Sequence, residues 1–323
     1  MKRRGITVLI GAALVALLTW QSLTMDVAYV AMGPGPTENV LGVTVDEDDV
    51  EHQIITADTA YETSGELRLT TVRVVQSVTL AEALGYWVSG EHAIIPRDLI
   101  YPPDQTQEEI SAEQEADWVE SQSNAEQAAL AYLGQPAELR VIADGGGLLE
   151  GDVLLQVAGT DIEALTDLKD FAEGETEVTV GRDGEQITVV TALGEAELEL
   201  TREDPFGIEI DTEALNIGGP SAGLIFALGI VDTVTEGALV GDLVVAGTGE
   251  IDAQGNVGGI GGVQQKIRAS AEIGVEVFLS PASNCADAVS VAPENMTIVK
   301  VETLADAVVA LEAITAGESV TTC

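Results

Sequence analysis

The chain has 323 residues, 13 of them Lys or Arg and 55 Asp or Glu, which gives a formal net charge of −42. This charge excludes nucleic acid as a partner, because phosphates would be repelled across the whole surface. With 46% apolar residues the chain has enough hydrophobic mass to fold, unlike a disordered acidic tail. Two cysteines and two histidines are too few for a zinc ribbon, an iron–sulfur centre or a haem motif, and no P-loop occurs. We therefore expect no metal, no cofactor and no ATP-binding motor within this chain.

The first 25 residues predict a cytoplasmic tail and a membrane anchor. Three cations, Lys2 to Arg4, precede the stretch Ile6 to Met25, in which no residue is charged. Twenty residues at helical rise cover about 30 Å, the thickness of the hydrocarbon core of a bilayer. The cations place the N-terminus in the cytoplasm and the rest of the chain outside it. A cleaved signal peptide is the alternative, because the strongly apolar part is short, but no clean small-x-small cleavage site follows it.

Export would allow the two cysteines to form a disulfide. In an oxidising compartment, a disulfide between Cys285 and Cys323 would fix the C-terminal tail. Two unpaired thiols are the alternative.

Residues 26–134 read as an extracytoplasmic region with strands and one long helix. Leu67 to Val75 is rich in Leu, Thr and Val and predicts a strand. Gln105 to Leu133 predicts a long helix that ends at Gly134, with its charge run on a solvated face.

Residues 135–200 are dominated by turn and strand signals. A turn at Gly145 to Gly147 leads into a strand that ends before Gly159, and Ile162 to Phe171 suits a short helix. Glu177 to Val180 and Gln186 to Val190 predict a hairpin around Asp183-Gly184.

This segment resembles the middle of a PDZ domain, through the pattern formed by Gly147, Leu148, Gly151, Asp152 and Gly159. The resemblance implies capture of an extended peptide by strand addition. The region before Gly145 is short for that fold, and Tyr132, Leu133 and Gly134 are the candidates for the peptide-binding loop. A small β-rich spacer without a ligand is the alternative.

The strongest chemical signal is a glycine-rich turn before an apolar run. The turn consists of Gly219-Pro220-Ser221-Ala222-Gly223 and precedes Leu224 to Val231. Because Pro suits the first position of a helix, Ser221 is expected on an N-terminal turn, near unpaired N–H groups that could stabilise an oxyanion. An ordinary N-cap serine is the alternative.

Lys266 is one of only four lysines, and it follows a second glycine turn that enters a helix. The positive end of the helix dipole and the apolar neighbours Val263 and Ile267 would both lower its pKa. A neutral amine is what a general base requires. A surface lysine packed along its aliphatic stem is the alternative.

A histidine is not expected to complete a catalytic triad, because His52 and His92 lie far from Ser221 in the sequence. A Ser–Lys dyad is then the natural hydrolytic arrangement, with Lys266 45 positions after Ser221.

The segment from 205 to 323 resembles the proteolytic domain of Lon-type serine proteases. The matching motifs are Gly219-Pro220-Ser221-Ala222-Gly223, Thr248-Gly249-Glu250 and Gly261-Gly262-Val263-Gln264-Gln265-Lys266. The resemblance implies that Ser221 is the nucleophile and Lys266 the base, with the Thr248 hydroxyl near the amine. Gly218 stands where many Lon proteases have Asp, which leaves the arrangement linked to that Asp in doubt but not the dyad.

The whole layout resembles a subfamily of membrane-anchored bacterial proteins (YlbL-like) that join an anchor, a PDZ domain and a Lon-type domain. It implies an α+β fold with a transmembrane helix at 1–25, an N-terminal region at 26–134, a PDZ-like domain at 135–200 and a Lon-type domain at 205–323. In that last domain the expected strands are Leu243 to Gly247, Val277 to Leu279 and Thr297 to Val301, and the expected helices are Ser221 to Val234, Val263 to Ile273 and Leu304 to Ile314.

The expected function is that of an ATP-independent serine endopeptidase acting outside the cytoplasm. Its partners would be unstructured or membrane-associated polypeptides and the membrane itself. Further copies of the chain would also be partners, because Lon-type domains often form rings. A non-catalytic PDZ-based binding scaffold and a protease that only processes its own juxtamembrane region are the alternatives.

Overall fold

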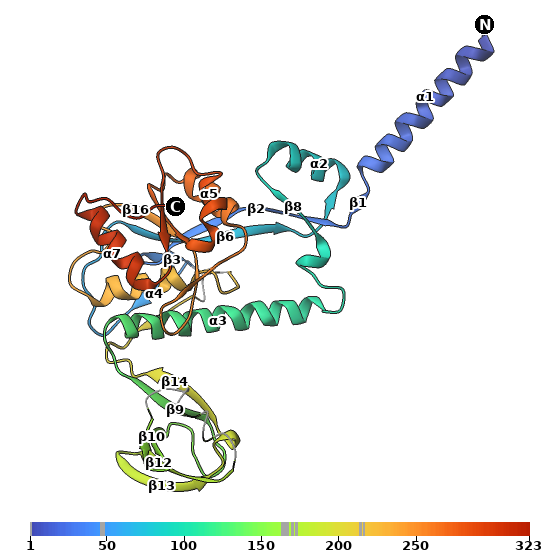
Figure 1. Cartoon of the computed structure of the whole chain (residues 1–323). Coiled ribbons are helices and arrows are strands. Elements are labelled where there is room, and N and C mark those ends of the chain that lie inside the picture. The colour runs from blue at the N-terminus through green and yellow to red at the C-terminus, as the bar shows by residue number, and fades with distance from the viewer. Residues whose placement is uncertain are drawn as a thin grey trace.

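The computed structural model describes residues 2–45, 49–162, 168, 171, 174–212, 215 and 217–323. Figure 1 shows an N-terminal helix that projects away, a body of mixed strands and helices, and a smaller β-rich part below that body. The expected mixture of helix and strand is confirmed.

The projecting helix is α1, Lys2–Leu23. Its stretch Ile6–Leu23 has a mean hydropathy of 1.9, and none of it is buried against the rest of the protein. The length, composition and position of this helix suit a membrane span or a signal sequence.

The body is built on one six-stranded sheet with the order β20-β19-β16-β6-β2-β8. β20, β19, β16 and β6 run parallel, while β2 pairs antiparallel with β6 and β8 antiparallel with β2. In chain order these strands are β2 (Tyr29–Asn39), β6 (Glu66–Val75), β8 (Ala93–Pro96), β16 (Val244–Gly247), β19 (Val277–Pro281) and β20 (Thr297–Val301). The strands predicted in these regions are confirmed.

The sheet corrects the expected domain boundaries. β2, β6 and β8 come from the region 26–134, whereas β16, β19 and β20 come from 205–323. Because β6 finds its parallel neighbour only in β16, the two regions cannot form separate domains and together make one body.

Helices cover both faces of the sheet. α5 (Val263–Glu272) and α6 (Cys285–Val289) lie on one face, and α4 (Gly223–Val234) lies on the other, where α3 (Gln107–Tyr132) and α7 (Leu304–Thr315) pack around it. Neighbouring residues of β16 point to opposite faces. Val245 belongs to the core on the α4 side, and Ala246 belongs to the core on the α5 side.

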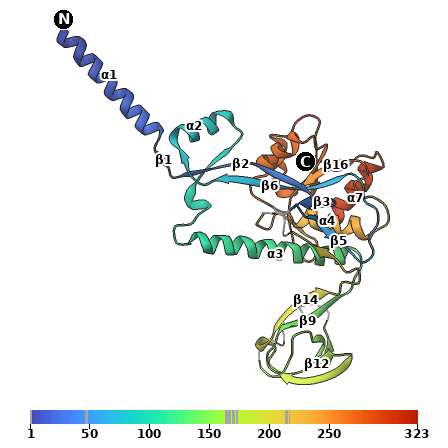
Figure 2. The same ribbon diagram turned by 180° about the vertical axis from the view of Figure 1, so that it is seen from behind.

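α4 is apolar all round, and a helix of this kind is stable only where every face is covered. All twelve of its residues are buried. α3 supplies part of the cover: the Trp118 ring meets the Phe226 ring edge-on at 5.4 Å between centroids. In both views α3 runs along the underside of the body, from below α2 to the β-rich part (Figures 1 and 2).

Three helices begin with a capping box, in which a threonine side chain and an acidic side chain three residues later satisfy each other's backbone N–H groups. The pairs are Thr79 with Glu82 before α2 (Leu80–Ser89), Thr106 with Glu109 before α3, and Thr303 with Asp306 before α7.

The β-rich part is an insertion within the body, since the chain leaves the body after α3 and returns to it after β14. Its sheet has the order β13-β12-β10-β9-β14, with β11 beside β10. The strands are β9 (Ala137–Ala143), β10 (Val153–Val157), β11 (Thr160–Asp161), β12 (Thr176–Arg182), β13 (Glu185–Thr191) and β14 (Glu197–Arg202). The insertion has its own hydrophobic core, and the predicted hairpin is confirmed as β12 and β13. The short helix expected at 162–171 falls mainly outside the described residues.

The insertion joins the body through polar contacts at Arg202. The Gln127 side chain of α3 accepts from the Arg202 N–H at 2.7 Å and donates to its carbonyl at 3.3 Å. The guanidinium of Arg202 donates to the Ala253 carbonyl of the body at 3.1 Å.

Four two-stranded pairs complete the described structure. They are β1 (Asp26–Val27) with β7 (Val78–Thr79), β3 (Val43–Val45) with β4 (Glu51–Gln53), β5 (Ile55–Thr56) with β15 (Glu209–Ile210), and β17 (Glu250–Ile251) with β18 (Val257–Gly258).

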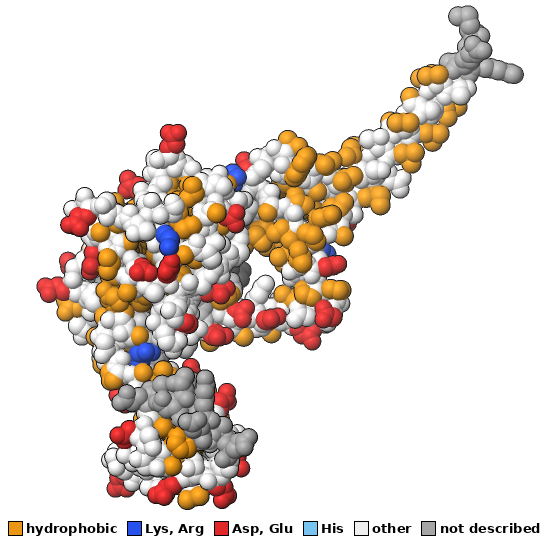
Figure 3. All heavy atoms as spheres, viewed as in Figure 1, with side chains coloured by type: hydrophobic (Ala, Val, Ile, Leu, Met, Phe, Trp, Pro, Cys, Tyr) orange, Lys and Arg blue, Asp and Glu red, His pale blue; other side chains and the backbone are white. Residues whose placement is uncertain are grey.

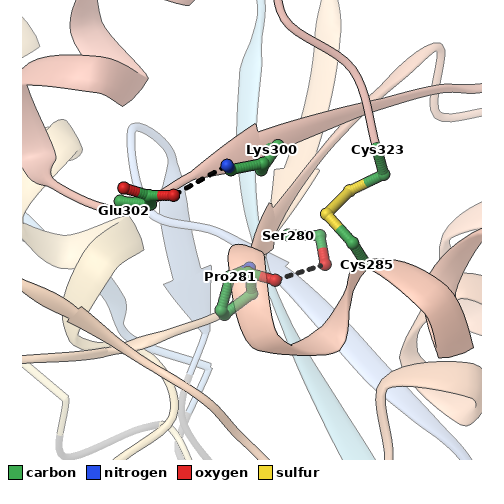
Figure 4. Close-up of a disulfide and its surroundings, with 6 residues drawn as sticks. All are labelled: Ser280, Pro281, Cys285, Lys300, Glu302 and Cys323. Carbon is green, nitrogen blue, oxygen red and sulfur yellow. Dashed lines mark hydrogen bonds and ion pairs between the residues drawn. A yellow bond between two sulfur atoms is a disulfide. The ribbon is translucent and has the colours of Figure 1, made fainter.

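The C-terminal tail closes the outer edge of the sheet. Lys300 N–H donates to Thr321 O, and Cys323 N–H donates to Ile298 O, so that the tail runs along β20. A disulfide joins Cys323 to Cys285 at the start of α6 (Figure 4). The tail that this bond holds covers the edge of β20, which would otherwise be open to pairing with another chain.

We predict that the double variant Cys285→Ala/Cys323→Ala loses about 2–4 kcal/mol of unfolding free energy, because the bond closes a long loop in the unfolded chain. The two cysteines are 38 residues apart. Urea unfolding with and without a reductant measures this loss, and the reductant should affect only the wild-type protein. Equal stability of the two proteins would show that the tail is held by its backbone bonds alone.

Candidate active site

Ser221, Thr248 and Lys266 meet at the ends of three different elements. Ser221 lies two residues before α4, Thr248 directly follows β16, and Lys266 is the fourth residue of α5. The Lys266 Nζ lies 2.6 Å from the Ser221 Oγ and 2.8 Å from the Thr248 Oγ1. The structure thus brings together side chains that are 45 and 18 residues apart in the chain.

The turn that carries Ser221 is fixed to the end of β16 by three hydrogen bonds. The Ser221 carbonyl accepts from Gly249 N–H and from the Thr248 hydroxyl, each at 3.0 Å, while Leu224 N–H donates to the Gly249 carbonyl at 3.1 Å. The serine therefore cannot move away from the end of β16 without breaking these bonds.

The helix after this turn begins later than the sequence predicts. α4 starts at Gly223 rather than Ser221, and the Ser221 side chain makes no cap. A Cβ at position 223 would lie 2.8 Å from the Ile251 Cγ2 and 3.0 Å from the Ser121 Oγ. Glycine is required there, because the first residue of α4 passes so close to β17 and α3.

The residues expected around an oxyanion do not all serve that purpose. Pro220 has no N–H, and the N–H of Gly219 donates to the Gln114 carbonyl at 3.1 Å. Within the part of the chain that the structure describes, the N–H groups of Ser221 and Ala222 have no acceptor. These two groups are the donors available to an anionic oxygen bound at the serine.

Lys266 is the only buried lysine among the described residues, with 2% of its surface exposed. Burial lowers its pKa to about 7, because the ammonium loses its hydration, and the negative charge of Glu250 opposes this shift. At neutral pH a large fraction of the amine is therefore unprotonated and able to accept a proton. Thr248, itself fully buried, accepts an N–H of the amine and holds the nitrogen beside Ser221.

A cavity of about 240 Å³ opens beside the turn that carries Ser221. Three carboxylates and several neutral groups line it: Asp117, Glu120, Ser121, Asn124, Pro220, Glu250 and Ile251. The pKa of Glu250 is raised by burial and by the charge of Asp117. A second cavity of about 330 Å³, between α7 and the C-terminal tail, contains none of the three central side chains.

The contribution of α3 to this region was not predicted. The Ser121 hydroxyl donates to the Pro220 carbonyl at 3.0 Å, and Asp117 and Glu120 lie on the same side of the helix. The sequence feature that indicates this contribution is the spacing of Trp118, Ser121 and Ala125. It places a small polar residue in the apolar stripe of α3 that packs on α4.

The residues predicted to bind a peptide end are not placed at a strand edge. Tyr132 is the last residue of α3 and Leu133 its C-cap, and Gly134 lies three residues before the start of β9. β9 is paired with β10 on one side and with β14 on the other. An extended peptide has no free edge to join at β9, whereas β13 and β14 each have one partner among the described strands.

Both histidines are engaged elsewhere. The His52 Nδ1 lies 2.9 Å from an Asp211 carboxylate oxygen, and the His92 ring packs against Tyr86. Among the described residues no group of three His, Cys, Asp or Glu side chains is arranged to hold a metal ion.

Comparison with known proteins agrees with the geometry. Residues 187–314 match the family model of the Lon protease (S16) C-terminal proteolytic domain. The Lon protease of Chloroflexus aurantiacus is 33% identical over 195 residues, 54% of this chain and 23% of that protein. Lon protease 1 of Herpetosiphon aurantiacus is 42% identical over 69 residues, 21% of this chain and 8% of that protein. The Lon protease of Phenylobacterium zucineum is 34% identical over 88 residues, 27% of this chain and 11% of that protein.

The chain thus spans less than a quarter of the length of these curated relatives. The matched segment begins in β13, inside the insertion, and ends within α7. It contains Ser221, Thr248 and Lys266.

We predict that the reaction of Ser221 with a fluorophosphonate probe becomes faster with rising pH, with a midpoint near 7. The lowered pKa of Lys266 means that the reactive neutral form is lost below this pH and fully present above it. Glu250→Gln should shift the midpoint to lower pH, because its charge stabilises the ammonium. Glu185→Gln, in the insertion, is the matched control and should leave the profile unchanged. A midpoint near that of a free lysine, about 10.4, would contradict the assigned role of burial.

Proposed function

Because the C-terminal part of this chain is a Lon-type serine peptidase domain, we propose that the whole protein is a serine endopeptidase that works through the Ser221–Lys266 dyad without ATP. The observation that carries the proposal is the 2.6 Å approach of a buried lysine amine to a serine hydroxyl. No other pair of described side chains combines a nucleophile with a base of suitable pKa in this way.

The proposed reaction begins when the neutral amine of Lys266 takes the proton of the Ser221 hydroxyl as its oxygen attacks a peptide carbonyl. The N–H groups of Ser221 and Ala222 would stabilise the tetrahedral oxyanion. The ammonium then protonates the departing amine, which leaves an acyl-enzyme. The regenerated amine activates a water molecule that hydrolyses the ester and frees the serine.

Thr248 would act as a positioning residue in this reaction. Its hydroxyl accepts from Lys266 and donates to the Ser221 carbonyl, so it fixes the distance between base and nucleophile. The contact links the two halves of the dyad through one rigid side chain at the end of β16.

We predict that Ser221→Ala and Lys266→Arg each reduce cleavage of an unfolded polypeptide at least about 10³-fold. Arginine keeps the charge and much of the bulk but does not lose its proton, so it cannot act as a base. Thr248→Val should cost about tenfold or more through the lost hydrogen bonds, and Thr248→Ser should restore the rate. Near-UV circular dichroism provides the check on folding.

Two outcomes would favour other functions. Full peptidase activity of the folded Lys266→Arg variant would show that Lys266 is not the base. Failure of Ser221 to react with a fluorophosphonate would support a binding scaffold without peptidase activity.

The carboxylates beside the nucleophile bear on the substrate. Asp117, Glu120 and Glu250 surround the cavity at Pro220, so a cationic side chain next to the scissile bond would be attracted and an acidic one repelled. We predict that peptides with Lys or Arg near the cleaved bond react about tenfold faster at low salt than matched peptides with Glu. The preference should shrink with added salt and in Asp117→Asn, and equal rates for the two peptides would refute it.

The membrane and the insertion complete the proposal. α1 would anchor the chain with its cationic end in the cytoplasm, and the Cys285–Cys323 bond fits an oxidising compartment outside it. The insertion would act as a PDZ-like module that holds unstructured polypeptide ends at a free strand edge, β13 or β14.

A further inference from the structure

The helix α2 exposes an apolar face that no other described part of the protein covers. Leu84, Trp87 and Val88 lie on one side of α2, at the spacing of one helical turn, and 72% of Trp87 and 79% of Val88 are exposed. Ala83 and Tyr86 face the body instead and pack with Ala31, Val78 and Ile94. Met25, just after α1, is also exposed. These four exposed residues are called the α2 patch.

The start of α2 is fixed to the end of α1. β1, which follows α1 after two residues, pairs with β7, and Asp26 lies opposite Thr79, the N-cap of α2. Leu80 N–H, the first of α2, donates to the Met25 carbonyl at 3.0 Å. Apolar side chains cover the region where α1 joins the body, and they continue from α1 over α2 (Figure 3).

The charge around the patch differs from that of the rest of the molecule. Residues 70–101 contain two arginines and three acidic residues, in a chain whose net charge is −42. The one acidic residue of α2, Glu82, is held by the N–H and hydroxyl of Thr79, each at 2.8 Å, at the start of the helix. Residues 70–101 therefore carry a formal charge of 2 − 3 = −1, far less than the charge that would keep the rest of this surface away from a membrane.

We propose that the α2 patch lies in the headgroup region of the bilayer that α1 spans, with Trp87 as its deepest aromatic contact. The inference rests on the proposed anchoring role of α1. A helix attached this close to the end of a membrane span must lie at the membrane surface, and an apolar helical face is buried about 5–10 Å into such an interface. Tryptophan is the residue that this environment favours.

Contact at α2 gives the body a second point of attachment. A single helix followed by a short linker would leave the body free to tilt, whereas α1 and α2 together define an orientation. The partner is the lipid surface itself, because the patch is continuous with α1.

The three tryptophans allow a direct test in full-length protein, reconstituted in phosphatidylcholine nanodiscs with or without brominated acyl chains. Trp20→Phe leaves Trp87 as the exposed reporter, since Trp118 is buried in the core. Trp87→Phe leaves Trp20 as the reporter of the anchor. The double variant Trp20→Phe/Trp87→Phe gives the Trp118 background, and Val190→Trp in that double variant provides a control on the exposed face of the insertion.

The expected result is blue-shifted emission from Trp87 and loss of its intensity in the brominated discs, with no loss from Trp118 or from the tryptophan at position 190. Quenching of Trp20 alone, with Trp87 open to iodide, would overturn the proposal while leaving the anchor in place. Absence of quenching at both positions would remove the anchor and the patch together. Protection of Trp87 that depends on protein concentration and not on lipid would assign the patch to a second copy of the chain.

Discussion

The site depends on excluding water from a single amine. The surface is strongly acidic, and the negative charge of Glu250 favours the charged form of Lys266. Burial nevertheless lowers its pKa to about 7. Burial therefore has a larger effect on the pKa of Lys266 than the charge of Glu250, and any change that admits water to the amine would favour the ammonium form.

The parallel sheet supplies the rigidity that this burial requires. The carboxyl end of β16 places Thr248 between the other two side chains, and α4 and α5 approach that end from opposite faces of the sheet. Ser221 and Thr248 sit where a turn meets a regular element, and Lys266 lies in the first turn of α5. Their spacing is therefore set by the layers of the fold and not by a flexible loop.

Local signals in the sequence predicted much of this structure. The strands and helices around Ser221 and Lys266 follow from apolar runs bounded by glycine, and three motifs indicated the Lon-type domain. Contacts between distant segments could not be predicted in the same way. The residues of β6 predict a strand, but they do not indicate that its partner is β16. The sequence therefore predicts two separate regions, 26–134 and 205–323, where the structure has one body. Ser121 and Asp117 approach the site only because α3 packs on α4, a contact that helical periodicity allows but does not specify.

The insertion also sets the order in which the body can form. Thr70 of β6 donates to Gly247 of β16 across 177 residues of chain, and the whole insertion lies between them. Pairings between residues this distant in sequence form slowly, because the long segment between them loses conformational entropy before the new contacts can stabilise the pair. The sheet cannot be completed until β16 has been synthesised, and Lys266 comes later still. In the proposed mechanism, a growing chain carries Ser221 before it has Lys266, and it would be incapable of cutting its neighbours, or itself, until the last quarter of the polypeptide is in place.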